Sequence, residues 1–93
     1  MQIYIKSYCP YCVKLISLLD WEKIPYEVLD ISKHPEQWVI MEKISGHTGV
    51  PQVAIWDIIL YDYDTEETLV TDIRSILWTR DRKNLTSQFT LLT

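Results

Sequence analysis

The sequence has little glycine, few basic residues and no long apolar run, and each shortage excludes a class of protein. With two glycines among 93 residues, the loops are expected to be short. No stretch approaches the roughly 20 apolar residues that a membrane-spanning helix needs. The first residues lack the basic and long apolar regions of a signal peptide, so we expect a protein of the reducing cytoplasm.

Positive charge is in short supply, with nine lysines and arginines against 13 aspartates and glutamates and a net charge of −4. Because nucleic-acid binding requires clustered cations, we expect no nucleic-acid partner. Arg80, Arg82 and Lys83 form a small basic cluster that Asp81 interrupts, and we interpret it as a solvated helix end. We interpret no other charged segment as an interface, and we expect a monomer.

Four aromatic residues could form a patch for a protein partner or pack beneath secondary structure: Trp56, Tyr61, Tyr63 and Trp78.

The first third of the chain predicts a strand, a helix and a second strand in one domain. Residues 2–6 form an apolar run typical of a short buried strand. From residue 10 to residue 23 the apolar spacing becomes helical, and Pro10 suits the first turn because its missing N–H has no partner there. Pro25 ends the helix, and residues 26–29 have the pattern of a second strand. Such a unit predicts that its two strands are parallel.

The rest of the chain predicts a helix, a hairpin and a further helix. We expect the helix over about residues 35–45 and strands at residues 51–56 and 58–61, which are too close for a crossover and therefore antiparallel. The last helix is expected to begin at residue 64 or 65, because Asp64 and Glu67 have the spacing of a capping box. Its buried stripe consists of Leu69, Ile73, Ile76 and Leu77.

The resulting order, β-α-β-α-β-β-α, defines the fold class. It is the thioredoxin-like α/β layout, in which a four-stranded mixed sheet carries three helices on its two faces. We expect residues 1–83 to form the domain. Residues 84–93 are rich in threonine and weakly amphipathic, so we expect a loosely packed tail.

The most informative motif is Cys9-Pro10-Tyr11-Cys12, which contains both cysteines of the chain and lies between the first strand and the first helix. The thiolate is the reactive form of cysteine, and unpaired N–H groups at a helix N-terminus favour that anion. Cys9 is therefore expected to attack a disulfide, with Lys6 as a nearby cation. Cys12, one turn inside the helix, is expected to be more buried and to resolve the mixed disulfide. Tyr11 is expected to project outward beside Cys9.

Other interpretations of these residues are open at this point. Both cysteines could be ordinary buried residues, or they could bind zinc, which needs four ligands in a closed site. Only His34 and His47 could complete such a site, and their spacing is outside the usual range, so we expect no metal. The dipeptide Val50-Pro51 allows either a cis peptide bond or a trans proline at the start of an edge strand.

Cys-Pro-Tyr-Cys at the head of a helix, with Val50-Pro51-Gln52 further along the chain, closely resembles the glutaredoxins, in particular their short dithiol class. Lys6, three residues before the first cysteine, matches the lysine of the family. The segment from Ser45 to Gln52 resembles the family loop that ends in Thr-Val-Pro. The resemblance covers residues 2 to about 80, and it implies that this chain has the fold of that family.

The resemblance also implies a binding site for glutathione. Val50-Pro51 would be a cis bond beside the thiols, and the Val50 backbone would pair with the cysteinyl part of glutathione. Lys6 would contact the glycine carboxylate, and Tyr11 would line the groove. The γ-glutamyl end would lie at Asp64 and Thr65, where Asp64 can bind the ammonium group and the helix N–H groups can bind the carboxylate.

The chain departs from the family beside this glutathione site. Tyr61-Asp62 stands where the family usually has Gly-Gly, which lets the backbone approach the glutamyl group closely. Asp62 also adds a negative charge where an anionic tripeptide must dock. Gly49 replaces a usual threonine, and His47 replaces a frequent arginine. Trp38 stands where a polar or basic residue is common.

The resemblance implies a glutathione-dependent thiol–disulfide oxidoreductase that reduces protein disulfides through both cysteines and glutathione mixed disulfides through Cys9 alone. Its partners would be glutathione and disulfide-containing or glutathionylated proteins. A first alternative is a redoxin of the same fold that a thioredoxin reductase recharges and that donates electrons to ribonucleotide reductase. A second is an iron–sulfur cluster carrier, in which two chains each provide Cys9 and two glutathione molecules complete the ligands.

Overall fold

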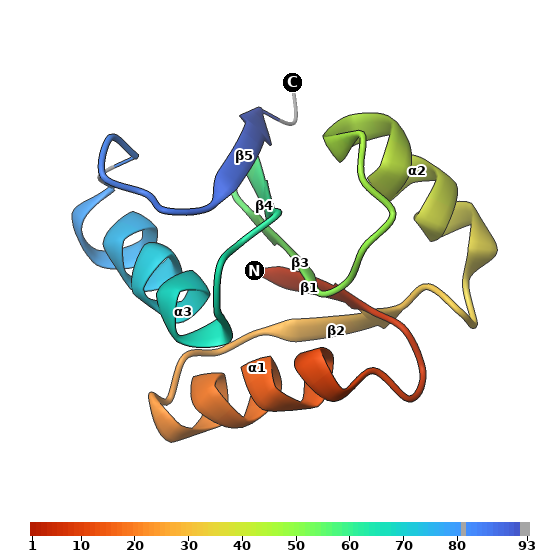
Figure 1. Cartoon of the computed structure of the whole chain (residues 1–93), viewed down its shortest axis with the longest axis horizontal. Helices are drawn as coiled ribbons and strands as arrows, with labels where there is room; N and C mark the ends of the chain where they lie inside the picture. Colours follow the sequence, from red (N-terminus) through yellow and green to blue (C-terminus); the bar gives the residue numbers. More distant parts are fainter. Residues whose placement is uncertain (81, 92–93) are drawn as a thin grey trace.

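A computed structural model describes residues 1–80 and 82–91 of the chain. It contains one mixed sheet with strand order β2-β1-β3-β4-β5 and helices against both faces (Figure 1). The elements are β1 (Gln2–Ile5), α1 (Pro10–Trp21), β2 (Glu27–Asp30), α2 (Pro35–Ser45), β3 (Gln52–Ile55), β4 (Ile58–Tyr61), α3 (Glu66–Arg74), the π-helical turn η1 (Ser75–Thr79) and β5 (Gln88–Leu91). The thioredoxin-like α/β class is therefore confirmed.

Strand pairing follows the predicted connections in the first four strands. β1 and β2 are parallel, with Ile3 opposite Val28, and α1 connects them. β3 runs antiparallel to β1 and forms the expected antiparallel hairpin with β4. The loop after β1 and the loop before β3 therefore meet at the same end of the sheet, because antiparallel neighbours begin where the other strand ends.

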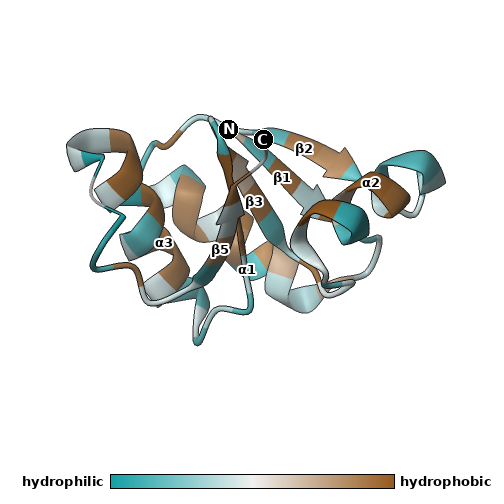
Figure 2. Ribbon diagram, turned by 90° about the horizontal axis from the view of Figure 1, so that it is seen from above, coloured by the Kyte–Doolittle hydropathy of each residue, from teal (hydrophilic) through white to brown (hydrophobic). Residues whose placement is uncertain are grey.

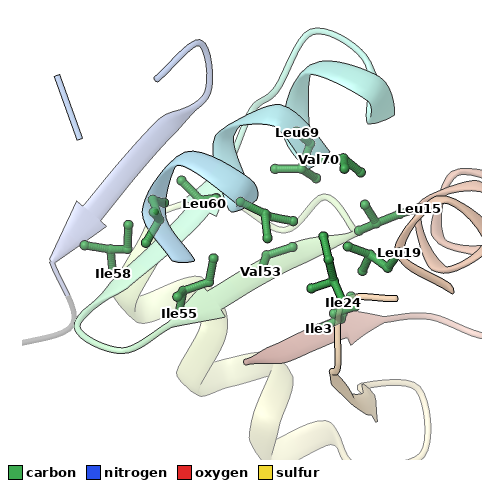
Figure 3. Close-up of a cluster of buried hydrophobic side chains, with 12 residues drawn as sticks. Ile3, Leu15, Leu19, Ile24, Val53, Ile55, Ile58, Leu60, Leu69 and Val70 are labelled. Carbon is green, nitrogen blue, oxygen red and sulfur yellow. The ribbon is translucent and has the colours of Figure 1, made fainter. Parts of the chain in front are cut away.

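Two apolar clusters lie on the two faces of the sheet. The larger one joins α1 and α3 to alternate residues of β3 and β4, among them Val53, Ile55 and Leu60 (Figure 3). The smaller one lies under α2 and includes Met41 and Ile59. Figure 2 shows brown and teal residues alternating along α2 and α3, as expected for helices with one buried face.

The prediction of four strands is wrong, because the segment after η1 adds a fifth. β5 pairs antiparallel with β4, with Phe89 opposite Leu60. The expectation of a loosely packed tail is therefore wrong for residues 88–91. The last two residues of that segment, Leu92 and Thr93, lie outside the described residues.

A buried carboxylate on α3 holds the segment that leads into β5. Asp72 is 1% exposed and accepts hydrogen bonds from the backbone N–H groups of Thr86 and Ser87, at 3.0 and 2.8 Å. The hydroxyl groups of the same two residues also donate to Asp72. Four donors therefore satisfy this carboxylate, and the chain beyond η1 returns to the sheet instead of extending into solvent.

The start of α3 differs by one residue from the predicted capping box. Thr65, not Asp64, is the N-cap, and its hydroxyl accepts a hydrogen bond from the Thr68 N–H at 3.1 Å. The Thr68 hydroxyl in turn accepts from the Thr65 N–H at 3.0 Å. The predicted stripe faces the core: Leu69, Ile73 and Ile76 are fully buried, and Leu77 is partly buried.

The four aromatic residues that could have formed one patch are divided between the two faces of the sheet and the exposed surface. Tyr63 packs against the larger apolar cluster, whereas Tyr61 packs against the smaller one on the opposite face of the sheet. Trp56 and Trp78 are exposed, and each ring lies near an arginine. Arg80, of the predicted basic cluster, contacts Trp56, while its neighbour Asp81 lies outside the described residues. No helix within residues 1–80 and 82–91 is long and apolar enough to cross a membrane.

Candidate active site

The two thiols lie at the N-terminus of α1. Cys9 is the N-cap residue, and its sulfur accepts a hydrogen bond from the Cys12 N–H at 3.2 Å. Both cysteines are free thiols; Cys9 is partly exposed, whereas Cys12 is 1% exposed. The predicted difference in burial is therefore observed, because the helix turns the side chain of Cys12 into the protein and leaves Cys9 at the helix end.

The loop that presents Cys9 is tied to the end of β2. The Ser7 hydroxyl donates to Asp30 at 2.9 Å, and the Ser7 N–H donates to the Ser32 hydroxyl at 2.9 Å. Tyr8 follows with a φ of +62°, in the left-handed region that few residues other than glycine adopt. These contacts fix the chain on the amino side of Cys9, so the thiol is held by α1 on one side and by this loop on the other.

The buried thiol has an altered acidity. Burial, together with the neighbouring Cys9 thiol, raises the pKa of Cys12 to about 12. A raised pKa means that Cys12 carries its proton throughout the neutral range. Cys12 can therefore act as a nucleophile only when an adjacent reaction removes that proton, which suits a second, resolving step better than a first attack.

Alkylation of the reduced protein tests this difference. At pH 7.5 iodoacetamide is expected to label Cys9 and to leave Cys12 unmodified until denaturant is added. The thiolate fraction of Cys12 should be on the order of a thousandfold below that of an ordinary cysteine, and its labelling rate should rise about tenfold per pH unit up to about pH 12. Mass spectrometry of the labelled peptides assigns the sites. Equal labelling of both cysteines in the folded protein would contradict the assignment.

The loop before β3 lies against the reactive sulfur. The Val50–Pro51 peptide bond is cis, which is one of the two possibilities that the sequence allowed. The Cys9 thiol lies 3.9 Å from the Val50 carbonyl oxygen. The buried Gln52 side chain fixes this loop, because its amide group donates to the carbonyl oxygens of His47 and Gly49 at 2.9 Å each. Val50 and Pro51 therefore lie beside Cys9, as the sequence resemblance implied.

Lys6 has an aromatic partner. Its ammonium nitrogen lies 4.4 Å from the centre of the Trp38 ring, which is close enough for a cation–π contact. Trp38 is one of the departures from the family pattern, and it comes from α2. Lys6 and Trp38 thus hold each other in position. They come from distant segments, so no local sequence pattern predicts this contact.

Tyr63 lies near the two thiols, and Glu66 lies near Lys14 of α1; neither was predicted as a site residue, although Tyr63 was weighed as part of an aromatic patch. Burial raises the pKa of Tyr63, and Glu66 and the two thiols contribute further. Tyr63 is therefore within electrostatic reach of both cysteines. Glu66, the first residue of α3, is 7% exposed and lies 3.5 Å from the ammonium group of Lys14 on α1. An alternation of apolar and polar residues does not predict a buried glutamate at this point.

The other predicted residues lie around this cluster. Tyr11 is exposed, as expected from its place in the motif. Asp64 is exposed, and the hydroxyl of the next residue, Thr65, is engaged in the capping box. The two histidines weighed as zinc ligands lie elsewhere: His34 faces Glu36, and the His47 ring lies 4.5 Å from that of Tyr61. Within residues 1–80 and 82–91, no three His, Cys, Asp or Glu side chains group together as a metal site would require.

Comparison with known proteins gives consistent matches for the first part of the chain. The family model described as Glutaredoxin matches residues 1–57. Glutaredoxin 1 of Rickettsia typhi is 36% identical over 55 residues, 57% of this chain and 53% of that protein. Glutaredoxin 3 of Escherichia coli K12 is 36% identical over 55 residues, 59% of this chain and 66% of that protein. Glutaredoxin-C4 of Arabidopsis thaliana is 39% identical over 57 residues, 57% of this chain and 42% of that protein.

The matched region has clear limits. It spans only about half of the length of the first of these relatives, at 53%. The family match ends at residue 57, so β4, α3 and β5 lie beyond it. No solved structure matches the chain significantly. The cysteines and the Val50-Pro51 loop are inside the matched region, whereas Asp64 and Thr65 are outside it.

Proposed function

Since the chain belongs to the glutaredoxin family, we propose that it is a thiol–disulfide oxidoreductase of the Cys-Pro-Tyr-Cys dithiol class and that glutathione is its reductant. One observation carries the proposal: a partly exposed Cys9 at a helix N-terminus, with a buried Cys12 whose N–H contacts its sulfur at 3.2 Å. This arrangement gives one thiol access to substrate and keeps the other in reach for the second step.

The proposed reaction has two steps that exchange two electrons. The Cys9 thiolate attacks one sulfur of the substrate disulfide, the S–S bond breaks, and the other sulfur leaves as a thiolate. Cys12 then loses its proton and attacks the sulfur of Cys9, which releases the second substrate thiol and leaves a Cys9–Cys12 disulfide. Two glutathione molecules reduce this disulfide and become glutathione disulfide. A glutathione mixed disulfide needs only Cys9, since a second glutathione can replace Cys12.

The proposed glutathione contacts are Lys6, Tyr11, Val50, Pro51, Asp64 and Thr65. Three features support them. The Val50 backbone lies beside Cys9, where the cysteinyl part of glutathione must be. Tyr11 is exposed next to Cys9. The N-terminus of α3, where Thr65 is the cap, has the positive end of a helix dipole, which favours a carboxylate. The proposed partners are glutathione and proteins with disulfides or glutathione adducts, and the proposed compartment is the cytoplasm.

A coupled assay tests this function. Wild-type protein and Cys12→Ser are supplied with a small glutathione mixed disulfide, glutathione, glutathione reductase and NADPH, and the absorbance of NADPH is followed. We expect turnover by both, with Cys12→Ser keeping at least about half of the wild-type rate, because Cys9 suffices for this substrate. Absence of turnover by folded wild-type protein would rule out glutathione as the reductant.

A specific observation favours a second candidate, a redoxin that a thioredoxin reductase recharges and that serves ribonucleotide reductase. Tyr61 has a bulky side chain where the family has glycine; its ring contacts His47 and its hydroxyl lies 2.8 Å from that of Thr90 on β5. Asp62 keeps a left-handed backbone, with a φ of +50°, but adds a carboxylate. Reduction of the Cys9–Cys12 disulfide by thioredoxin reductase, without glutathione turnover, would support this candidate.

A further inference from the structure

Aromatic side chains are exposed on both sides of Cys9. Tyr8, the residue before it, is fully exposed, and Tyr11 is 62% exposed. Both lie in or next to the loop that presents the reactive thiol. Exposed tyrosine rings offer apolar area and a π-face that attracts lysine and arginine side chains.

Two carboxylates face solvent at the end of the sheet where the thiols lie. Asp62 and Asp64 are both exposed, and they follow the end of β4, which pairs with β3 beside the Val50–Pro51 loop that contacts Cys9. Among the described residues, no lysine or arginine pairs with either carboxylate. Their charge is therefore available to a bound substrate.

The lysine of α1 is paired with acidic side chains. Lys14 lies 3.0 Å from Glu67 and 3.5 Å from Glu66, so this group of three carries a net negative charge. Lys6 keeps its positive charge over the Trp38 ring of α2, where the proposed function assigns it to the glycine carboxylate of glutathione. Tyr8, Tyr11, Asp62 and Asp64 thus form a surface that combines exposed aromatic rings with unpaired negative charge. Such a surface is complementary to positively charged peptide and repels a negatively charged one.

We propose that the protein substrates of the Cys9 site are cationic segments, in which lysine or arginine residues flank the disulfide or mixed disulfide. The inference rests on the proposed thiol–disulfide exchange and names its substrate class. The chemistry is the exchange already described, with the same bonds broken and formed. Asp62 and Asp64 act as specificity-determining residues, since they attract the flanking cations, and Tyr8 and Tyr11 provide the rings over which those cations can lie.

The test uses two synthetic peptides that differ only in the residues flanking one cysteine, which are lysines in one peptide and glutamates in the other. Each cysteine is blocked as a mixed disulfide with the neutral thiol 2-mercaptoethanol. Reduced wild-type protein in excess reduces each peptide in a single turnover, so no glutathione is present. Because flanking charge also alters the intrinsic reactivity of a disulfide, each rate constant is divided by that measured with dithiothreitol.

We expect the normalised rate constant for the lysine peptide to exceed that for the glutamate peptide about tenfold at low salt. The ratio should fall toward one near 1 M salt, where the screening length is only about 3 Å. Asp62→Asn should lower the low-salt ratio about threefold, and the double variant with Asp64→Asn should lower it further. Asparagine is chosen at position 62 because it tolerates the left-handed backbone found there.

Glu27→Gln is the matched control, since it removes the same charge from an exposed residue at the start of β2, at the end of the sheet away from Cys9. It should leave the ratio unchanged. A normalised ratio of one at low salt, or a preference for the glutamate peptide, would overturn the inference. Failure of the protein to reduce either peptide would instead refute the proposed thiol–disulfide exchange, so the two failures are distinguishable.

Discussion

Replacing Cys9 by serine is expected to lower the rate of thiol–disulfide exchange by at least about a thousandfold, because a hydroxyl is far less acidic and less nucleophilic than a thiol. Cys12 cannot substitute for Cys9, since it is 1% exposed and burial raises its pKa to about 12. The same coupled assay measures the loss, with reduction of a protein disulfide as a second readout. Residual turnover above about a tenth of the wild-type rate would show that Cys12 attacks substrate directly.

The fold should survive this substitution, so the loss can be attributed to chemistry. Cys9 is the N-cap of α1, and its sulfur accepts the Cys12 N–H. Serine is among the best N-cap residues, and its hydroxyl can accept the same hydrogen bond. Circular dichroism and the unfolding midpoint of Cys9→Ser should match those of wild type. The Cys12→Ser variant provides the functional control, because it removes the other thiol and leaves the attacking one.

The largest expected change in stability comes from Asp72→Ala, which should lower the free energy of unfolding by about 3 kcal/mol. The carboxylate is buried and accepts four hydrogen bonds from Thr86 and Ser87. Without it, those donors either remain buried without a partner or draw the segment away from α3 and carry β5 with it. Urea unfolding followed by tryptophan fluorescence measures the change.

Asp57→Ala is the matched control for this experiment. Asp57 pairs with Arg82 at the surface, where both side chains are more than a third exposed, so the same chemical change should have little effect on stability. Equal effects of the two substitutions would contradict the role of Asp72. Protection of the β5 amides from hydrogen exchange should fall in Asp72→Ala and not in Asp57→Ala, which locates the loss in this segment.

Local sequence rules predicted most of the fold for identifiable reasons. The apolar runs, Pro10 and Pro25 mark the ends of the first strand and helix, and the short spacing between residues 51–56 and 58–61 leaves room only for a hairpin. β5 was not predicted because its order depends on Asp72, a carboxylate that binds Thr86 and Ser87, fourteen and fifteen residues later in the chain. A long-range contact of this kind leaves no periodic signal in the segment that it orders.

In the candidate site, too, local motifs were predicted and long-range contacts were not. The cysteine motif and Val50-Pro51 are each a short continuous motif at the end of a predicted element. Their proximity was therefore expected, and the structure places them side by side. The Lys6–Trp38 contact and the buried Glu66 could not be derived, since the first joins the loop after β1 to α2 and the second joins α3 to α1. The capping box was misplaced because Thr65 and Asp64 are both good N-cap residues, and local preference alone does not choose between neighbours.

The fifth strand has a consequence for how the chain avoids aggregation. β4 contains Ile58, Ile59 and Leu60, all fully buried, and β5 is the strand that pairs with its outer edge. An uncovered strand of this composition would expose unpaired backbone N–H and C=O groups and apolar side chains, with which a strand of another chain could pair. During synthesis that edge stays open until residues 88–91 leave the ribosome. The newly made chain is therefore most exposed to intermolecular strand pairing at β4 just before β5 closes over that edge.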